Sequence, residues 1–365
     1  METIIPEKKK IALGLSGGVD SSVAAYLLRE QGYDVTGVYI QCWEKESDGC
    51  ASDEDKAYAL QSAAKLGIKF THLNFIDRYK SKVIEYFYSE YAAGRTPNPD
   101  VMCNKEIKFG IFYDWAMEQG FDYVATGHYA RISKDVEDPS TTKYLLKKGL
   151  DQSKDQSYFL YLLDQEHLAK TLLPIGDLQK TEVRQIAARI KLPTAQRPDS
   201  MGVCFIGEVD IKDFLKQRLP EKTGNIVNKS GEVIGTHEGS WFYTIGQRHG
   251  FKVTKYSGKP MYIIGKNSET NELLVGFEED VYSDSFTVIN PHWISQSPFK
   301  PNIRQLHCTV RIRHLGQIYD CVVGSGENLT IKTEKPVFAI APGQSAVFYD
   351  GDTVLGGAII DKVAY

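Results

Sequence analysis

Residues 13–22 read LGLSGGVDSS, a glycine-rich turn between an apolar run and an amphipathic segment. The apolar run, residues 9–15, predicts a strand, and residues 20–31 predict a helix that Gly32 closes. Small residues in such a turn let backbone N–H groups converge on an anion, and the positive end of the helix dipole strengthens the attraction. The stretch therefore predicts a phosphate-binding turn, although it has neither a Walker lysine nor a G-x-G-x-x-G spacing.

Two other interpretations of this turn are open at this stage. Residues 14–18 also fit the G-x-S-x-G nucleophile elbow, but that elbow follows several strands, whereas this turn follows the first strand. A purely structural glycine turn is the second. Anion binding is favoured because Ser16, Ser21 and Ser22 add hydroxyl donors. Asp20 stands at the helix start, where a carboxylate would cap the helix or hold Mg²⁺.

Strand and helix patterns alternate after this turn. Repeated βα units predict a mostly parallel sheet with helices on both faces, which is a Rossmann-like α/β domain. Strands are expected at residues 33–40, 68–75 and 122–129, and helices at 53–66, 79–93, 105–119, 157–172 and 179–192.

The pattern changes after Cys204 to short alternating runs punctuated by Gly, Asn and Ser, which predicts antiparallel β structure. The last part of the chain has the pattern of a small β-barrel. The domains expected are a catalytic α/β domain at 1–207, a central β-rich domain at 208–280 and a C-terminal β-barrel at 281–365.

Length and composition fit a folded chain of two or three domains: 365 residues, 42% hydrophobic and 25% charged. No apolar run approaches the roughly 20 residues of a membrane helix, and the first residues do not form a signal peptide. We expect a cytoplasmic monomer without membrane attachment. Six cysteines without a C-x-x-C spacing do not predict a disulfide scaffold or a zinc ribbon.

A net charge of −4 does not exclude a nucleic-acid partner, because binding depends on local basic surface. One basic stretch runs from Lys180 to Arg197, and a second from Arg304 to Arg313. On charge alone, both fit solvated faces.

The segment from Gly94 to Lys105 contains Asn98, Asp100 and Cys103 on a proline-stiffened approach. Cys103 directly precedes the helix expected at 105–119, so the helix N-terminus and nearby lysines would lower its pKa. A buried, inert cysteine is the alternative.

Cys204 lies between glycines in DSMGVCFIG, residues 199–207. A cysteine on such a loop that meets a second cysteine across the fold suits redox chemistry or sulfur transfer.

Seven further segments occur in a characteristic order. With the turn, they resemble the PP-loop ATP pyrophosphatases and, within them, the bacterial tRNA-specific 2-thiouridylase family over essentially the whole chain. The segments are AGRTPNPD (93–100), CNKEIKF (103–109), ATGHY (125–129), KDQSYFL (154–160), GVCFIG (202–207), TIGQR (244–248) and APGQSAVFY (341–349).

The resemblance implies an adenine nucleotide α hydrolase-like first domain that splits ATP to AMP and pyrophosphate, with Mg²⁺ as companion ion. Ile40 departs from the methionine that the family often has at that position, and the change is harmless if the adenine contact is made by backbone. The ATP-binding residues implied are Gly14, Leu15, Ser16, Gly17, Gly18, Val19, Asp20, Ser21, Ile40 and Gly127.

The resemblance also implies a reaction at C2 of the wobble uridine of tRNA. ATP would adenylylate the uridine O2, Cys204 would carry a persulfide, and Cys103 would release its sulfur by forming a disulfide, or reduce it after direct attack. Asp100 would act as acid or base beside the flipped base. The persulfide would come from an upstream donor, either a sulfur-relay protein or a cysteine desulfurase.

Contacts with tRNA are implied at three places, and the two basic stretches then become candidate phosphate contacts. No resident metal is expected in the site, although an iron–sulfur cluster on Asp100, Cys103 and Cys204 is a weaker alternative. The tRNA-contacting residues implied are Asn98, Pro99 and Asp100 at the target base, His128 with Lys154, Asp155 and Gln156, and Arg313, His314 and Gln344.

Two rival functions remain open. One is a small-molecule PP-loop ligase, which would need neither paired loop cysteines nor a C-terminal RNA-contacting barrel. The other is a redox-regulated RNA-binding protein with a degenerate nucleotide site, against which the intact turn and the NPD segment argue.

Overall fold

A computed structural model describes residues 8–43, 51–135, 143–199, 204, 207, 210–256 and 258–363. Cys50 and most of the motif around Cys204, apart from Cys204 itself and Gly207, lie outside these residues. The chain forms two compact units. The first contains Met1–Val83, Asp100–Glu208 and Asp352–Val354, and the second contains Ile84–Pro99, Val209–Gly351 and Leu355–Tyr365.

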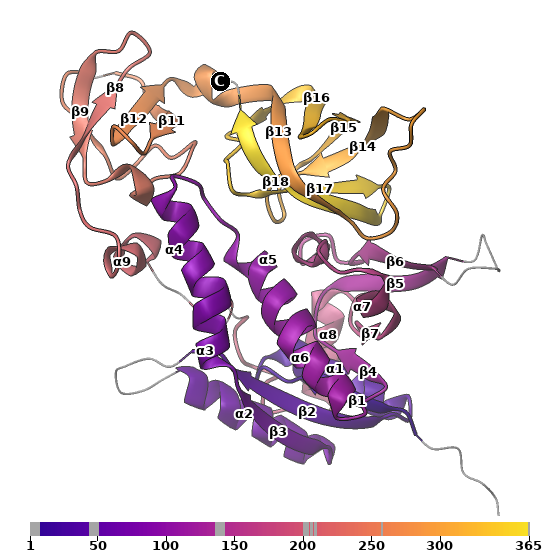
Figure 1. Cartoon of the computed structure of the whole chain (residues 1–365). Coiled ribbons are helices and arrows are strands. Elements are labelled where there is room, and N and C mark those ends of the chain that lie inside the picture. The colour runs from indigo at the N-terminus through magenta and orange to yellow at the C-terminus, as the bar shows by residue number, and fades with distance from the viewer. Residues whose placement is uncertain are drawn as a thin grey trace, which may run out of the picture. The chain divides into compact units, whose positions relative to one another are not determined.

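The first unit is built on a five-stranded parallel sheet with the strand order β3-β2-β1-β4-β7 (Figure 1). The chain goes from β1 to one side of the sheet and later returns to its other side, so β1 and β4 border a topological switch point. Open α/β sheets bind ligands at the carboxyl ends of the strands beside such a point. The strands are β1 (Lys10–Gly14), β2 (Asp34–Gln41), β3 (Lys69–Asn74), β4 (Tyr123–Ala125) and β7 (Thr171–Leu172).

Three helices share one hydrophobic core with β1 and β2. They are α1 (Val19–Glu30), α2 (Ala51–Leu66) and α8 (Lys180–Arg189), and Val23, Ala63 and Ala187 represent them in this core. Each helix presents an apolar face at the 3.6-residue period, and burying that face supplies most of its stability. These three helices were all predicted.

A continuous helical run leads away from the expected catalytic segment. It comprises α5 (Pro99–Cys103), a π-helical stretch η2 (Asn104–Ile111) and α6 (Phe112–Glu118). The sequence predicted this helix but placed its start too late, because the helix begins at Pro99. Proline suits the first turn, where its missing N–H has no partner to lose.

The prediction of one helix over residues 157–172 is wrong. The segment forms a 3₁₀ turn η3 (Ser157–Leu160), a short α7 (Gln165–Ala169) and the edge strand β7. Asp164 caps α7 by accepting a 3.0 Å hydrogen bond from His167 N–H, which starts a new helix inside the predicted one. A hairpin of β5 (Ala130–Asp135) and β6 (Lys143–Lys148) was not predicted.

The second unit contains a five-stranded sheet with the order β10-β9-β8-β12-β11. Its pairings are antiparallel as predicted, except that β12 runs parallel to β8. Its strands are β8 (Gly224–Val227), β9 (Val233–His237), β10 (Lys252–Val253), β11 (Tyr262–Asn267) and β12 (Glu272–Gly276), accompanied by α9 (Ile211–Lys216), η4 (Ser240–Phe242) and η5 (Glu278–Val281).

Six further strands form a barrel in the order β13-β16-β15-β14-β17-β18, which antiparallel pairing of β13 with β18 closes. Its core includes Val310, Ile331 and Phe348. The fold-class prediction, a parallel-sheet domain followed by two small β domains ending in a barrel, is therefore confirmed. The barrel strands are β13 (Tyr282–Trp293), β14 (Gln305–Arg311), β15 (Ile318–Gly324), β16 (Leu329–Phe338), β17 (Ser345–Asp350) and β18 (Thr353–Val363).

The second unit also includes the segment before the expected catalytic residues. Helix α4 (Glu85–Ala92) follows α3 (Ile76–Tyr79) and the π-helical η1 (Lys80–Ile84). The Tyr88 ring of α4 stacks on Phe214 of α9, with centroids 5.4 Å apart.

Candidate functional site

The predicted phosphate-binding turn joins β1 to α1 at the switch point of the sheet. Gly17 has a φ of 80°, and a Cβ there would meet the Asp55 carbonyl oxygen at 2.2 Å, so only glycine fits. Ser16 and Ser21 hydroxyls lie 3.2 Å apart beneath the turn. The Ser22 hydroxyl donates to the Gly18 carbonyl at 2.8 Å. These contacts hold the turn around the N–H groups of the first turn of α1, which have no acceptor inside the helix.

Gly127 packs the segment after β4 directly against the turn. A Cβ on Gly127 would lie 2.7 Å from the Ser21 nitrogen, so a side chain here would displace the start of α1. Gly14 differs, because a Cβ there would make only ordinary contacts, the nearest at 3.8 Å from Phe112. The remaining ATP-binding candidates Leu15, Val19 and Ile40 are buried.

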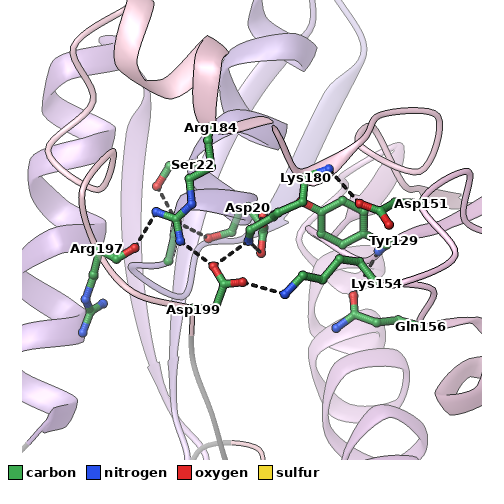
Figure 2. A network of polar contacts seen from close by, with 12 residues as sticks. Asp20, Ser22, Tyr129, Asp151, Lys154, Gln156, Lys180, Arg184, Arg197 and Asp199 are labelled. Carbon is green, nitrogen blue, oxygen red and sulfur yellow. Dashed lines mark hydrogen bonds and ion pairs between the residues drawn. The ribbon is translucent and has the colours of Figure 1, made fainter. Parts of the chain in front are cut away.

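Asp20 lies in the first turn of α1 but does not cap it, because Gly18 is the N-cap residue and makes no side-chain capping bond. Its carboxylate accepts hydrogen bonds from the Tyr129 hydroxyl and from Lys180 Nζ, each at 2.8 Å (Figure 2). Burial and the Asp20 charge raise the pKa of Tyr129, so this hydroxyl keeps its proton. Lys180 comes from the start of α8 and places an ammonium group beside the turn.

Asp199 belongs to the same network, because it contacts the Lys180 ammonium group that also binds Asp20, as Figure 2 shows. Its carboxylate contacts Lys180 Nζ at 2.9 Å, Lys154 Nζ at 2.8 Å, and the Arg184 guanidinium. Although burial alone would raise it, the two lysines hold the pKa of Asp199 well below its ordinary value. The carboxylate is thus ionised throughout the neutral range.

Arg197 ties the turn to α2. It donates to the Gly17 carbonyl at 2.8 Å, forms an ion pair with Asp55, and lies over the Tyr58 ring at 4.7 Å. Three basic residues of the first basic stretch, Lys180, Arg184 and Arg197, are therefore engaged inside the first unit.

The predicted catalytic residues Asp100, Cys103 and Cys204 are brought together. Asp100 Oδ1 accepts a 2.9 Å hydrogen bond from the Cys204 N–H, although the two residues are 104 positions apart. The Tyr79 hydroxyl donates to the Cys204 carbonyl at 2.7 Å. Burial raises the pKa of Asp100, against the Cys204 N–H and the Lys108 charge, which lower it. The carboxyl is thus suited to hold or release a proton.

The two thiols are not equivalent. Cys103 is fully buried and hydrogen-bonded to Cys204, and burial raises the pKa of Cys103 well above its usual value. The hydrogen bond from Cys103 and the Lys108 charge lower the pKa of Cys204, despite its burial. Cys204 is therefore the residue disposed to ionise, and Cys103 donates its proton toward it.

This arrangement corrects the expectation for Cys103. Its pKa is raised rather than lowered, because burial and the neighbouring Cys204 outweigh the Lys108 charge. Cys103 also ends α5 inside a continuous helical run, so it does not stand before a helix N-terminus. Lys105 is exposed and lies 3.4 Å from Glu106, so Lys108 is the lysine at the thiols.

The predicted tRNA residues of the first unit already make internal contacts. His128 is buried, and its ring nitrogens lie 2.7 Å from Thr126 Oγ1 and 3.3 Å from Lys108 Nζ. The fully buried Asp155 accepts from the N–H groups of Gly149 and Ser157 at 3.0 and 3.1 Å. Gln156 Oε1 accepts from Tyr129 N–H at 3.0 Å, and Lys154 pairs with Asp199. Their roles toward tRNA stay predictions.

In the second unit, Gln344 lies against the segment that leads to Asn98 and Pro99. Its Nε2 donates to the carbonyls of Thr96 and Pro97 at 2.9 and 3.0 Å. Thus two of the predicted tRNA segments meet. Arg313 is exposed with its guanidinium bonded to the Ala339 carbonyl, and the adjoining His314 is half-buried.

Lys108 was expected near Cys103 together with Lys105, but four other residues that complete these two clusters were not predicted. Three of them, Tyr129, Lys180 and Tyr79, make their contacts with residues distant in sequence. The fourth, Asp199, opens the segment around Cys204, but no role was assigned to it. A signal existed for Lys180, which opens the basic stretch at a helix start.

No group of three or more His, Cys, Asp or Glu side chains is arranged to hold a metal ion among the residues that the structure describes. The iron–sulfur alternative thus gains no ligand set from the described residues. Within the same residues, no helix has the length and apolar character needed to cross a membrane.

The parallel sheet, the glycine turn at its switch point and the cations around it define a nucleotide-binding domain of the HUP class. The family described as "tRNA methyl transferase HUP domain" matches residues 9–208. The "tRNA methyl transferase PRC-barrel domain" matches residues 212–277, and the "Aminomethyltransferase beta-barrel domain" matches 283–360.

Curated relatives match the whole chain. The tRNA-specific 2-thiouridylase MnmA of Bacillus subtilis is 45% identical over 98% of this chain and 96% of that protein. That of Bacillus cytotoxicus is 44% identical with the same coverage. The chain belongs to the tRNA-specific 2-thiouridylase family.

Among solved structures, the U34-tRNA thiolase NcsA from Methanococcus maripaludis with its 4Fe–4S cluster is 20% identical. The match covers 55% of this chain and 62% of that chain, with a TM-score of 0.36.

Proposed function

We propose that this chain is an ATP-dependent tRNA-uridine 2-sulfurtransferase that acts on the wobble uridine. Family membership supports thiolation of a tRNA uridine. The observation that carries the proposal is the meeting of Asp100, Cys103 and Cys204 in the unit that also holds the phosphate-binding turn. His128, which follows β4 like Gly127, connects the two regions through Lys108.

The turn is suited to the triphosphate of ATP, because Gly17 and Gly127 let the backbone pack closely around the start of α1, whose first N–H groups can bind an anion. ATP would adenylylate the uridine O2 and release pyrophosphate. The Ser16 and Ser21 hydroxyls and the first N–H groups of α1 would bind phosphate oxygens. Lys180 would supply the cation that a Walker lysine supplies elsewhere. Asp20, held by Tyr129 and Lys180, is the carboxylate placed to face Mg²⁺ bound to the phosphates.

Cys204 would receive the sulfur, because its thiolate is the more stable of the two. The thiolate attacks the outer sulfur of a donor persulfide, giving a Cys204 persulfide and the donor's thiolate. Cys103 then attacks the inner sulfur, forms a Cys103–Cys204 disulfide and releases hydrosulfide. Hydrosulfide adds to C2 of the activated uridine, AMP leaves with the O2 oxygen, and 2-thiouridine remains.

A second order of events uses the same groups. The persulfide's terminal sulfur attacks C2 and displaces AMP, and Cys103 then attacks Cys204 sulfur. This forms the same disulfide and frees the thiocarbonyl. In both orders a two-electron thiol reductant must regenerate the enzyme.

Asp100 is the proposed acid or base. Its raised pKa, caused by burial, makes protonation at neutral pH more accessible than for an exposed aspartate. Held against Cys204 N–H, the carboxyl can take the proton that leaves with sulfur addition or protonate the AMP leaving oxygen.

The proposed partners are tRNA and a persulfide donor protein. The tRNA contacts would come from Asn98 and Pro99 at the target base and from Arg313, His314 and Gln344 in the barrel. The same-unit contact of Gln344 with the Thr96 and Pro97 carbonyls supports a shared surface.

The proposal is tested with unmodified tRNA transcript, Mg-ATP, a persulfide donor and a thiol reductant. Nucleoside mass spectrometry should find 2-thiouridine at the wobble position, with AMP and pyrophosphate formed in equal amounts. Cys204→Ser should abolish transfer from the persulfide, whereas Cys308→Ser, on a barrel strand, should retain it. A Cys204→Ser variant with native activity from the persulfide donor would contradict the proposal. AMP formation that depends on a small acceptor instead of tRNA would favour the ligase rival.

A further inference from the structure

Lys108 is a charged side chain at the thiols that the proposed chemistry does not use. As a whole residue Lys108 is half-buried. Its ammonium group, however, hydrogen-bonds to Cys204 and faces Cys103 and Asp100. Its nitrogen also lies 3.3 Å from His128 Nε2. A lysine enclosed this way needs anionic or accepting neighbours to remain charged.

The π-helical stretch explains why Lys108 reaches this place. In an α-helix, a residue five positions on points about 140° away around the axis. In a π-helix, whose hydrogen bonds join residues five apart, the same residue returns close to the starting face. Cys103 precedes η2 and Lys108 lies within it. The wider turn therefore brings the ammonium group to the side of the helix that carries Cys103.

His128 fixes the far side of the Lys108 ammonium. Because an ammonium group only donates, His128 Nε2 must be the acceptor, and the ring proton then lies on Nδ1. That N–H points to Thr126 Oγ1 at 2.7 Å. Burial and the Lys108 charge both lower the pKa of His128 well below its ordinary value, which keeps the ring neutral. A neutral ring holds the lysine without competing with it for the sulfur.

The charges facing Lys108 are of one sign. Cys204, Cys103 and Asp100 all favour the charged lysine, and burial is the opposing effect. Cys42, which follows β2, is a third thiol in the electrostatic field of Lys108, but burial raises its pKa. One ammonium group near these four acidic groups is expected to stabilise the anion that forms most easily, which is the Cys204 thiolate.

We propose that Lys108 is a catalytic residue that stabilises sulfur anions at Cys204, first the thiolate that accepts sulfur and then the outer sulfur of the persulfide, and that His128 positions it. The inference rests on the proposed function and deepens it. In the accepting step, the Cys204 thiolate bonds to the donor's outer sulfur, the donor's S–S bond breaks, and the electron pair leaves on the donor's inner sulfur. Lys108 keeps its proton throughout, and its positive charge lowers the free energy of the sulfur anion.

The test is the pH dependence of Cys204 alkylation by iodoacetamide in the reduced full chain, followed on the Cys204 peptide by mass spectrometry. Removing an adjacent opposite charge raises a thiol pKa by about 1 to 3. Lys108→Met should therefore slow alkylation at pH 7 about tenfold or more and shift the profile to higher pH. Lys108→Arg should restore most of the native rate. The matched control is Lys105→Met, on the same helix with its charge at Glu106, and it should follow the native profile.

His128→Ala should shift the profile in the same direction by a smaller amount, because it loosens Lys108 without removing its charge. A Lys108→Met profile that superimposes on the native one would overturn the proposal. If that variant does not fold, the pKa of Cys204 is measured in the native chain instead. It is obtained from the difference in thiolate absorbance between the native chain and Cys204→Ser as the pH is varied. A value at or above the ordinary thiol pKa of about 8.5 would overturn it.

These measurements contain no tRNA, ATP or sulfur donor. A failure of the proposed function would leave the alkylation shift in place. A missing shift, with thiolation and its dependence on Cys204 intact, would remove only the role of Lys108.

Discussion

Two charged clusters of the first unit differ in how their charges are balanced. Around Asp20 and Asp199, each carboxylate has cations at 2.8–2.9 Å, and the partners remain partly exposed. Around Cys204, one lysine faces a carboxyl and three thiols, and Cys103 and Cys42 are almost wholly buried. The first cluster fixes geometry with ionised groups, and the second shifts the pKa values of its members. This difference supports the proposed division of roles, in which the turn binds ATP and the thiol cluster transfers sulfur.

The largest effect is expected from Cys103→Ser, because the sulfur end then lacks the thiol that completes transfer. Steady-state thiolation should fall by on the order of 10³ or more, as for loss of a nucleophile. One pyrophosphate released per chain would show the nucleotide end intact, and mass spectrometry should find the sulfur retained on Cys204, either as a persulfide or bonded to the uridine. Cys321→Ser, on a barrel strand, is the control. Native turnover by Cys103→Ser would contradict the division between the two ends.

Lys180→Met tests the nucleotide end. Losing the cation beside the turn should lower the rate of AMP formation by about 10² while Cys204 alkylation keeps its native pH profile. Arg189→Met, on the exposed side of the same helix, should leave both unchanged. A Lys180→Met variant with a changed pH profile of Cys204 alkylation and a native rate of AMP formation would contradict the separate roles of the two clusters.

Gly127→Ala should have a smaller effect. The added Cβ would lie 2.7 Å from the Ser21 nitrogen, so the start of α1 must shift. We expect the KM for ATP to rise about tenfold, equivalent to about 1.4 kcal/mol of binding free energy. Gly14→Ala adds a Cβ with ordinary contacts and should change KM less. Equal changes in KM for the two substitutions would show that the close packing of Gly127 against the start of α1 does not determine ATP binding by the turn.

The smallest effect concerns stability below neutral pH. Folding keeps His128 neutral, whereas in the unfolded chain its ordinary pKa of about 6.5 lets it bind a proton as pH falls. Acidification therefore favours the unfolded chain, and His128 should contribute a loss of up to about 2 kcal/mol between pH 7 and 5. Denaturant unfolding should show a shallower pH dependence for His128→Gln than for the native chain. Parallel pH dependences would mean that His128 takes up its proton as readily in the folded state as in the unfolded chain, which would contradict a buried neutral ring.

Sequence predicted the structure of the turn between β1 and α1 well, because its parts are contiguous: strand, glycines and helix follow one another within residues 9–31. It singled out Asp100, Cys103 and Cys204 from their loop segments, and resemblance to the family supplied the catalytic roles expected of them. It did not find the contact of Lys180 with Asp20, which joins residues 160 positions apart. Nor did it foresee the raised pKa of Cys103, because that depends on burial and on a helix that starts at Pro99. Long-range charge pairing and burial are properties of the packed fold.

The same reason explains the wrong helix over residues 157–172. Most of its apolar run is buried, including Tyr158, Leu160 and Leu163, so periodicity alone could not separate a helix from short packed turns. Asp164 could have marked a new helix start by its N-capping preference.

The central claim is that ATP splitting and the thiol pair serve one reaction. Its most direct measurement is a single turnover of the persulfide-loaded chain with unmodified tRNA and Mg-ATP, without reductant. The account predicts one 2-thiouridine, one AMP, one pyrophosphate and one Cys103–Cys204 disulfide per chain, and then arrest. Thiouridine formed without that disulfide, or repeated turnover with no reductant present, would contradict it.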